Sequence, residues 1–156
     1  MEIRRAEEKD LSRVKDLLSQ VLEIHASIRP DLFIPGTTKY TDEELLDIFK
    51  DDMRPVFVAA DENDQVVGYA FCVMHDPVDS NNMIPHGMLY IDDLVVDQST
   101  RGKHVGRTLF EYVKAYAKEQ GCYHVTLNVW EGNDSARKFY ESVGLKVQKT
   151  VMETIL

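Results

Sequence analysis

The chain has 156 residues, enough to bury a hydrophobic core without disulfides or a structural metal, and we expect a single domain over 1–156. Its hydrophobic fraction of 44% and charged fraction of 29% are ordinary for a globular protein, and a net charge of −9 disfavours nucleic acid as a partner. No apolar run approaches the ~20 residues of a membrane helix, and MEIRRAEEKD at the start lacks a signal-peptide core, so no membrane association and a cytoplasmic location are expected.

The first half of the chain predicts a strand, two helices and a hairpin. A short strand is expected at 2–6, and apolar residues then recur at helical spacing up to Ile28, with Asp10 as the N-cap. The segment RPDLFIPGTTKY (29–40) contains prolines and a glycine and predicts a loop, after which TDEE has the spacing of a capping box for a second short helix. Two β-rich runs around the turn DENDQ predict a hairpin over 55–74, followed by the polar loop 75–87.

The second half predicts a strand–helix–strand–helix order. A strand is expected at MLYIDDLVV (88–96), a helix from about 105 that ends at Gly121, and an alternating strand at 122–130. Asn133 is the expected N-cap of a last helix that ends at Gly144, and the tail LKVQKTVMETIL is compatible with one or two final strands. The fold class is therefore α/β in the broad sense (α+β): a central mixed, mostly antiparallel sheet flanked by helices.

The hexapeptide RGKHVG (101–106) lies between a predicted strand and a predicted helix. Unpaired amides at a helix N-terminus suit a diphosphate, Gly102 permits close backbone approach, and Gly106 is expected to leave room on the ligand side. The Walker motif of nucleoside triphosphate sites and the dinucleotide fingerprint G-x-G-x-x-G are both absent. The alternative is an ordinary strand–turn–helix connection.

Two stretches together resemble the Gcn5-related N-acetyltransferase (GNAT) family: IDDLVVDQSTRGKHVGRTLF and NDSARKFYESVGL. The first carries Arg101 and Gly106 of the family motif [RQ]-x-x-G-x-[GA], with His104 in place of glycine. The second meets N-x-x-[AS]-x-x-[FL]-Y-x-x-x-G-[FL] at every position, from Asn133 to Leu145. The sequence resemblance covers about 88–145, whereas the order of elements agrees over the whole chain. It implies a GNAT-like fold and an acetyltransferase.

The same resemblance implies a site for acetyl-CoA, with CoA as the product and no metal. The backbone of Leu94, Val95 and Val96 would pair with the acetyl carbonyl and the pantetheine arm. The pyrophosphate would be held at the turn and helix start, by Arg101, Gly102, Lys103, His104, Val105, Gly106 and Arg107. Asn133, Ser135 and Ala136 would meet the pantetheine and the outer end of the cofactor. His104 is compatible with this site, because histidine tolerates a positive φ better than most residues.

Tyr140 would, from the resemblance, donate a proton to the leaving sulfur. A thiol with a pKa near ~8.5 leaves readily and needs only a weak acid, for which a tyrosine near ~10 suffices. The alternative is a core tyrosine whose hydroxyl is hydrogen-bonded.

The acceptor amine must lose a proton, because an alkyl ammonium has a pKa near ~10.4. Asp92 is the first candidate for the base, since strand alternation places Tyr90 and Asp92 on one face and Asp93 on the other. Asp93 is a rival because a bulge would shift the alternation. Either carboxylate could instead pair with a cationic side chain or cap a loop.

The acceptor site is expected to be built from the loops at 29–40 and 75–87. Arg29 and Phe33 are candidate contacts, together with Tyr90 and Asp93, although such residues more often only hold a loop in place. The expected acceptor is a small primary amine or polyamine, because the carboxylate pair suits a cation and resembles diamine acetyltransferases. A protein N-terminus, a lysine or an antibiotic are the alternatives.

The mechanism expected is direct transfer in a ternary complex, because Cys72 and Cys122 lie outside the motifs. A non-catalytic acyl-CoA-binding sensor on the same fold is the alternative from another class. The apolar end VMETIL could be an exposed edge that pairs, which is compatible with a homodimer.

Overall fold

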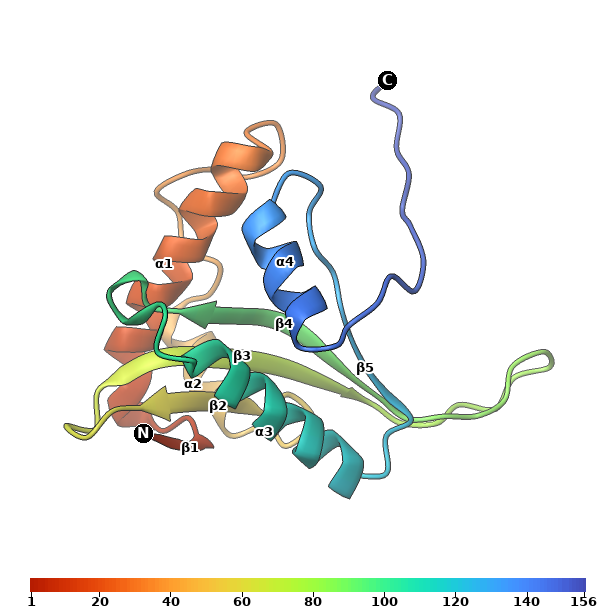
Figure 1. Ribbon diagram of the computed structural model, residues 1–156, viewed down its shortest axis with the longest axis horizontal. Helices are drawn as coiled ribbons and strands as arrows, with labels where there is room; N and C mark the ends of the chain where they lie inside the picture. Colours follow the sequence, from red (N-terminus) through yellow and green to blue (C-terminus); the bar gives the residue numbers. More distant parts are fainter.

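The computed structural model describes residues 1–156 and contains one sheet of five strands (Figure 1). The strands are β1 (Glu2–Arg5), β2 (Val56–Ala60), β3 (Val66–His75), β4 (Met88–Val96) and β5 (His124–Leu127), in that spatial order. Neighbouring strands pair antiparallel from β1 to β4, whereas β5 pairs parallel to β4. The sheet is therefore mixed and mostly antiparallel, as predicted.

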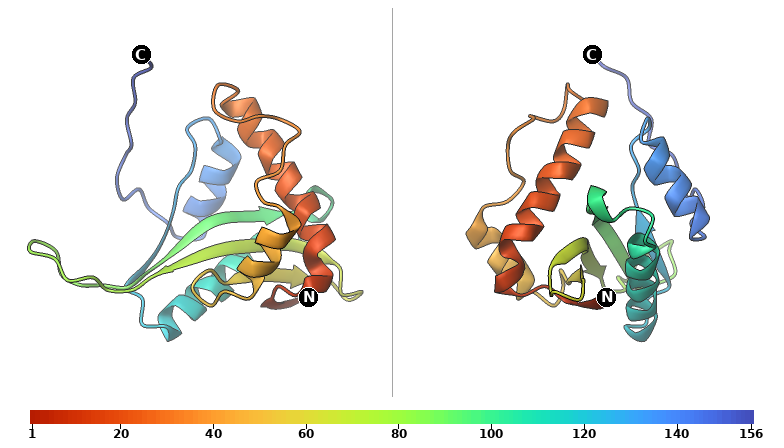
Figure 2. Two further views of the ribbon diagram at one scale, coloured as in Figure 1. Left: turned by 180° about the vertical axis from the view of Figure 1, so that it is seen from behind. Right: turned by 60° about the vertical axis from the view of Figure 1, so that its left-hand side comes forward.

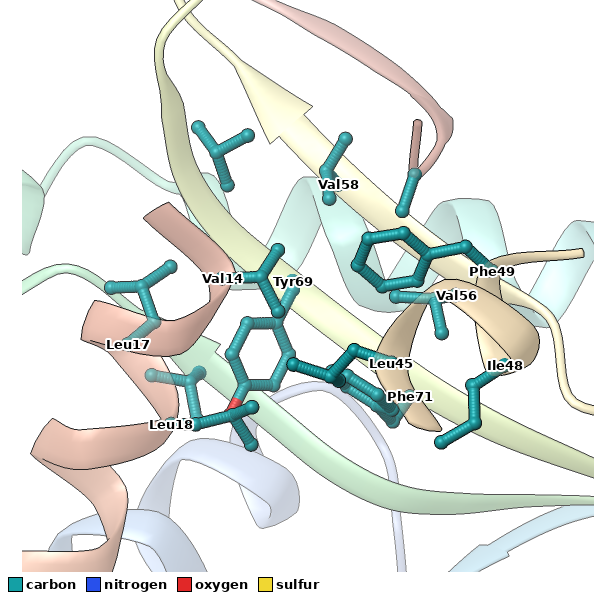
Figure 3. Close-up of a cluster of buried hydrophobic side chains, with 13 residues drawn as sticks. Val14, Leu17, Leu18, Leu45, Ile48, Phe49, Val56, Val58, Tyr69 and Phe71 are labelled. Atoms are coloured by element: carbon teal, nitrogen blue, oxygen red, sulfur yellow. The ribbon is translucent and has the colours of Figure 1, made fainter. Parts of the chain in front are cut away.

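Four α-helices flank the sheet in two layers (Figure 2). The helices are α1 (Leu11–Ile28), α2 (Asp42–Phe49), α3 (Val105–Glu119) and α4 (Asp134–Ser142), and two short 3-10 helices cover Glu8–Asp10 and Gln98–Thr100. α1 and α2 pack on one face of the sheet around Tyr69 and Leu45 (Figure 3). α3 packs on the other face around Phe57 and Leu109. The strands bury side chains on both faces, which explains the unbroken apolar run VFVAA in β2.

The predicted helix boundaries are set by the expected local signals, with one difference. Thr41 forms a capping box with Glu44, and Gly121 adopts a φ of 78° after α3. Asp10 lies at the N-cap position of α1, as predicted, but its side chain does not cap that helix, because a 3-10 turn over Glu8–Asp10 precedes it. Its buried carboxylate instead accepts hydrogen bonds from the Glu7 amide at 2.8 Å and from Arg4 at 2.7 Å.

The tail 145–156 forms no strand, which differs from the prediction of one or two final strands. No backbone hydrogen bond joins 146–156 to the rest of the chain. The tail is extended and runs apart from the sheet in Figure 1, and its Glu153 accepts a hydrogen bond from Arg29 at 2.6 Å. A strand needs a partner for its backbone groups, and within this chain the tail has none.

None of the helices combines the length and the apolar character that a membrane span requires.

Candidate active site

The last two strands of the sheet, β4 and β5, separate partway along their length. They pair from Met88 opposite His124 to Ile91 opposite Leu127, and β4 then continues to Val96 without a neighbour on that side. Figure 1 shows β5 leaving β4 toward α4. The Asp97 amide donates a hydrogen bond to the Val67 carbonyl of β3 at 2.8 Å. Because backbone groups alternate in direction along a strand, those of Val95 also face β3, whereas those of Leu94 and Val96 face the open edge. An extended ligand could therefore bind there as an added strand.

A bulge in β4 changes the faces of its two carboxylates. The register with β3 shifts between Phe71 and Cys72, so that Phe71 lies opposite Asp93 and Cys72 opposite Ile91, with Asp92 as the extra residue. Leu89 and Ile91 pack on the α3 side, whereas Val95 packs on the α1 side. The simple alternation that would direct Asp93 away from the face of Asp92 is therefore wrong.

The two carboxylates have different partners on that face. Asp92 accepts a hydrogen bond from the Lys39 ammonium at 2.8 Å and is 30% exposed. Burial disfavours the charged form of Lys39, but the contact with Asp92 outweighs it and raises the pKa of Lys39. Asp93 accepts a hydrogen bond from the Tyr69 hydroxyl at 2.9 Å. Burial raises the pKa of Asp93 to about 6, although the Tyr69 bond opposes this shift.

Tyr140, on α4, has a hydroxyl without a hydrogen-bond partner in the chain. Burial, together with the nearby charge of Asp93, raises the pKa of Tyr140 well above its usual value. Tyr140 therefore keeps its proton at any physiological pH, as a proton donor must. A core tyrosine with a satisfied hydroxyl does not describe this arrangement.

The first turn of α3 presents amides that no group in the chain accepts. His104, at the N-cap, provides no capping side chain, and the first amide of the helix with an acceptor is that of Thr108. Gly102 has a φ of 85° with open space around its Cα, and Arg101 and Lys103 are exposed. Free amides, the positive end of a helix dipole and nearby cations are the features that an anion-binding site requires.

Other predicted residues of this turn have structural partners. His104 adopts a left-handed φ of 60°, the conformation that its place in the motif requires. Gly106 does not leave room for a ligand as expected: a Cβ there would lie 2.9 Å from the Phe139 ring, so this glycine permits close packing of α3 against α4. The Arg107 guanidinium donates to the Ser142 carbonyl at 3.2 Å.

The N-terminus of α4 holds the three other predicted cofactor positions. Asn133 caps the helix, because its side-chain oxygen accepts a hydrogen bond from the Ala136 amide at 3.4 Å. Ser135 is exposed and makes no side-chain hydrogen bond. Tyr140, farther along α4, is close enough to Asp93 of β4 for the carboxylate to affect its pKa.

Arg29 and Phe33 lie together at the C-terminal end of α1, against the loop after β5. The Phe33 ring contacts His25 and packs edge-on against Trp130, and the Arg29 guanidinium lies 5.5 Å from the centre of the Trp130 ring. Tyr90 is on β4, where its hydroxyl accepts a hydrogen bond from Asn128 at 3.1 Å. One end of the loop 29–41 thus lies against Trp130, and near its other end Lys39 contacts Asp92.

Two residues of the site were not predicted from the sequence. Tyr69 is the only hydroxyl in the buried run VVGYAF, and a buried tyrosine hydroxyl usually needs a partner, which was a usable signal. Lys39 had no such signal, because a loop lysine in a sequence is most simply a solvated charge.

Comparison with known proteins identifies the fold family. The chain matches the Acetyltransferase (GNAT) family over residues 19–145. It is 37% identical over 93 residues to the peptidyl-lysine N-acetyltransferase YjaB of Escherichia coli, an alignment that covers 60% of this chain and 50% of that protein. It is 38% identical over 56 residues to glucosamine 6-phosphate N-acetyltransferase of Arabidopsis thaliana, covering 36% of each chain. The matched region thus spans half or less of these relatives.

Solved structures are similar over the whole chain. A crystal structure of a mutant of the BH1408 protein from Bacillus halodurans has a TM-score of 0.95 and 31% identity, and the alignment covers 100% of this chain and 99% of that one. The separation of β4 and β5, the free N-terminus of α3 and these alignments together identify the class of protein. The chain belongs to the GNAT acetyltransferase family.

The residues present fit the cofactor that this family implies. The free amides of the α3 turn offer donors for a pyrophosphate, and Gly102 leaves open space beside them. The open edge of β4 offers the groups of Leu94 and Val96 for an extended pantetheine arm.

Proposed function

We propose that the protein is an acetyl-CoA-dependent N-acetyltransferase that transfers an acetyl group directly to a small primary amine. The observation that carries this proposal is the open edge of β4, with free amides at the start of α3 at one end and the unpaired Tyr140 hydroxyl beside it. Acetyl-CoA supplies the acetyl group as an activated thioester. The chain's own residues bind, orient and move protons.

The proposed binding mode uses backbone groups at both contacts. Leu94 and Val96 pair with the pantetheine amides, and the turn from Gly102 to Arg107 holds the pyrophosphate. Of the cationic side chains, Arg101 and Lys103 are free to approach the phosphates, whereas Arg107 is held by the Ser142 carbonyl.

The contact between Lys39 and Asp92 supports a primary amine as the acceptor. The Lys39 ammonium is itself a primary alkylammonium, and it is bound by a carboxylate at the bulge of β4. We infer that the acceptor's ammonium replaces Lys39 at Asp92. Asp93 is bonded to Tyr69, so Asp92 is the one carboxylate of the pair that a cation contacts, which favours a singly charged amine over a long polyamine.

The proton transfers in this proposal balance across the site. Asp92 takes the proton of the ammonium, directly or through water, and the free amine attacks the thioester carbonyl. The carbon–sulfur bond breaks as Tyr140 donates its proton to the sulfur, and the second proton that the nitrogen loses passes through water to the Tyr140 oxygen, which restores the donor. Cys72 is not a suitable nucleophile for an acyl-enzyme, because burial raises its pKa to about 12.

A panel of amines assayed by thiol release with acetyl-CoA tests the proposal. We expect turnover with at least one small primary amine, and Tyr140→Phe should lower kcat about 10²- to 10⁴-fold while acetyl-CoA binding stays unchanged. Binding of acetyl-CoA without turnover of any amine, and with no effect of Tyr140→Phe, would instead indicate a non-catalytic acyl-CoA sensor.

The identity of the base is tested in the same assay. Asp92→Asn is expected to lower kcat/KM about 10²-fold or more, and Asp93→Asn less than about tenfold. The reverse order would assign the base to Asp93, and the activity should then rise with pH through about 6, because only the deprotonated carboxylate accepts a proton.

A further inference from the structure

One lysine of the chain, Lys39, lies in the chain's own candidate active site. Its ammonium donates a hydrogen bond at 2.8 Å to Asp92, the carboxylate proposed to bind the acceptor amine and take its proton. The other lysines that form ion pairs are Lys9, Lys15 and Lys114, and their partners lie outside the site. Lys39 thus occupies the position that we assign to the acceptor.

The backbone that carries Lys39 is held in place by its neighbours. The Tyr40 ring stacks on Phe71 with ring centres 6.0 Å apart and 12° between the planes, and Phe71 belongs to the buried cluster of Figure 3. Thr41 follows directly and caps α2. The Lys39 ammonium lies 5.4 Å from the centre of the Tyr40 ring. An ordered segment therefore directs the side chain to Asp92.

The position proposed for the thioester is close to this ammonium. Asp92 and Leu94 are two residues apart on β4, which corresponds to roughly 6–7 Å, and the backbone of Leu94 faces the open edge. The flexible four-carbon stem of a lysine spans such a distance without movement of the backbone. Besides burial and the bond to Asp92, the charge of Asp93 acts on the pKa of Lys39, as it does, besides burial, on that of Tyr140. The ammonium and the proposed proton donor therefore lie near the same carboxylate.

We propose that the protein acetylates its own Lys39 and that this modification frees Asp92 for an external acceptor. The step uses the cofactor and the proton transfers of the proposed function, on which it rests. Asp92 takes one proton from the Lys39 ammonium and releases it to water. The nitrogen then bonds to the acetyl carbon as the carbon–sulfur bond breaks, Tyr140 gives its proton to the sulfur, and the second nitrogen proton returns through water to the Tyr140 oxygen. The products are an amide on Lys39 and the free thiol of CoA.

Acetylation removes the cation that contacts Asp92. The amide on Lys39 is neutral and forms no ion pair, so the carboxylate becomes available to the ammonium of an acceptor. Lys39→Arg keeps a cation at this position and offers no lysine amine to acetylate. Initial rates should give acetylated protein a KM for the amine about three- to tenfold lower than that of Lys39→Arg. An equal KM would contradict the release of Asp92.

Peptide mass spectrometry after incubation with isotopically labelled acetyl-CoA tests the modification directly. We expect acetyl-Lys39 to form at least about tenfold faster than acetyl-Lys50, because only Lys39 lies beside a base and a proton donor. Lys50 is exposed at the end of α2 and reports spontaneous acetylation. Spontaneous acetylation would be slower at Lys39: burial disfavours its charged form, but the bond to Asp92 outweighs this and raises its pKa, so less of its amine is neutral. Equal or slower modification of Lys39 would overturn the proposal.

The modification should depend on the active site of the same molecule. Tyr140→Phe should lower the rate at Lys39 about 10²-fold or more without changing the rate at Lys50. The wild-type rate constant should be independent of protein concentration, and wild-type protein should leave Lys39 of the Tyr140→Phe variant unmodified in a mixture. Acetylation of that variant by the wild type would overturn the intramolecular route.

Acetic anhydride probes Lys39 without the cofactor. This reagent reacts with neutral amines, so Lys39 should be labelled more slowly than Lys50, and Asp92→Asn should remove the difference. Fast labelling of Lys39 in the wild type would contradict its binding to Asp92. Turnover of an amine with Lys39 unmodified would overturn self-acetylation alone, whereas acetyl-Lys39 without turnover of any amine would support it and overturn the acceptor proposed above.

Discussion

At the scale of single residues, Lys39 is the unexpected member of the site. Its ammonium donates a hydrogen bond to the carboxylate of Asp92 at 2.8 Å, and this is a position suited to an acceptor amine. We expect Lys39→Met, which keeps the length of the side chain and removes the charge, to lower the KM for the amine by about three- to tenfold with kcat little changed. Steady-state kinetics with the best amine of the panel measure this. A higher KM would show that Lys39 instead positions the loop for the acceptor.

Asp93 is the carboxylate whose pKa is clearly raised by its surroundings. Its pKa is about 6 in the folded protein compared with ~3.9 in an unfolded chain, because burial disfavours the carboxylate. The unfolded state therefore loses its proton first as the pH rises. The contribution of Asp93 to stability is complete below about pH 4 and is lost as the pH rises through about 6.

Because the pKa of Asp93 is raised on folding, we predict that Asp93→Asn stabilises the protein at neutral pH. A shift of two pKa units corresponds to about 3 kcal/mol, and the amide can still accept the Tyr69 hydrogen bond, so we expect a gain of about 1 to 3 kcal/mol. Urea unfolding at neutral pH and at about pH 4 measures it, since the gain should vanish at the lower pH. Asp92→Asn is the control, and it should show no such gain because it loses the Lys39 ion pair.

At the scale of elements, the contact of α3 with α4 places Tyr140 relative to the free amides. The Phe139 ring occupies the space beside Gly106, only 2.9 Å from where a Cβ on that residue would lie. Gly106→Ala should lower the free energy of unfolding by about 1 to 2 kcal/mol and also reduce kcat, because α4 must move with Phe139. Adding Phe139→Leu should restore part of both losses. Urea unfolding and thiol-release rates of the single and double variants measure this. If the double variant loses as much stability and activity as the single variant, the steric cause is excluded.

At the scale of the whole molecule, the strongest consequence is stabilisation by the cofactor. A ligand that bridges β4, α3 and α4 is bound by the folded state only, so acetyl-CoA at about 100 times its dissociation constant should add about 2.7 kcal/mol. A thermal shift assay should show this rise with acetyl-CoA and a smaller one with ATP or NAD, which lack the pantetheine arm. No shift with acetyl-CoA would contradict the binding mode.

The order of strands and helices as far as α4 was predictable because local signals specify it. The capping box at Thr41, the cap at Asn133 and the positive φ of Gly121 act within a few residues of the chain, and all three are present. The position of Asp93 was not predictable from alternation alone. Its face depends on a bulge that forms only when β4 pairs with β3, two strands joined by a long loop.

The sequence by itself therefore determined the family and the element order as far as α4, because these depend on local propensity and on two ordered motifs, and it predicted the residues that we propose for the cofactor site. Only the tertiary structure decided the partners of those residues: Lys39 at Asp92, Tyr69 at Asp93, and Phe139 in the space beside Gly106. Each of these pairs joins segments distant in the chain. The physical reason is that burial and hydrogen bonding, which set charge and pKa, are properties of a neighbourhood that exists only after folding.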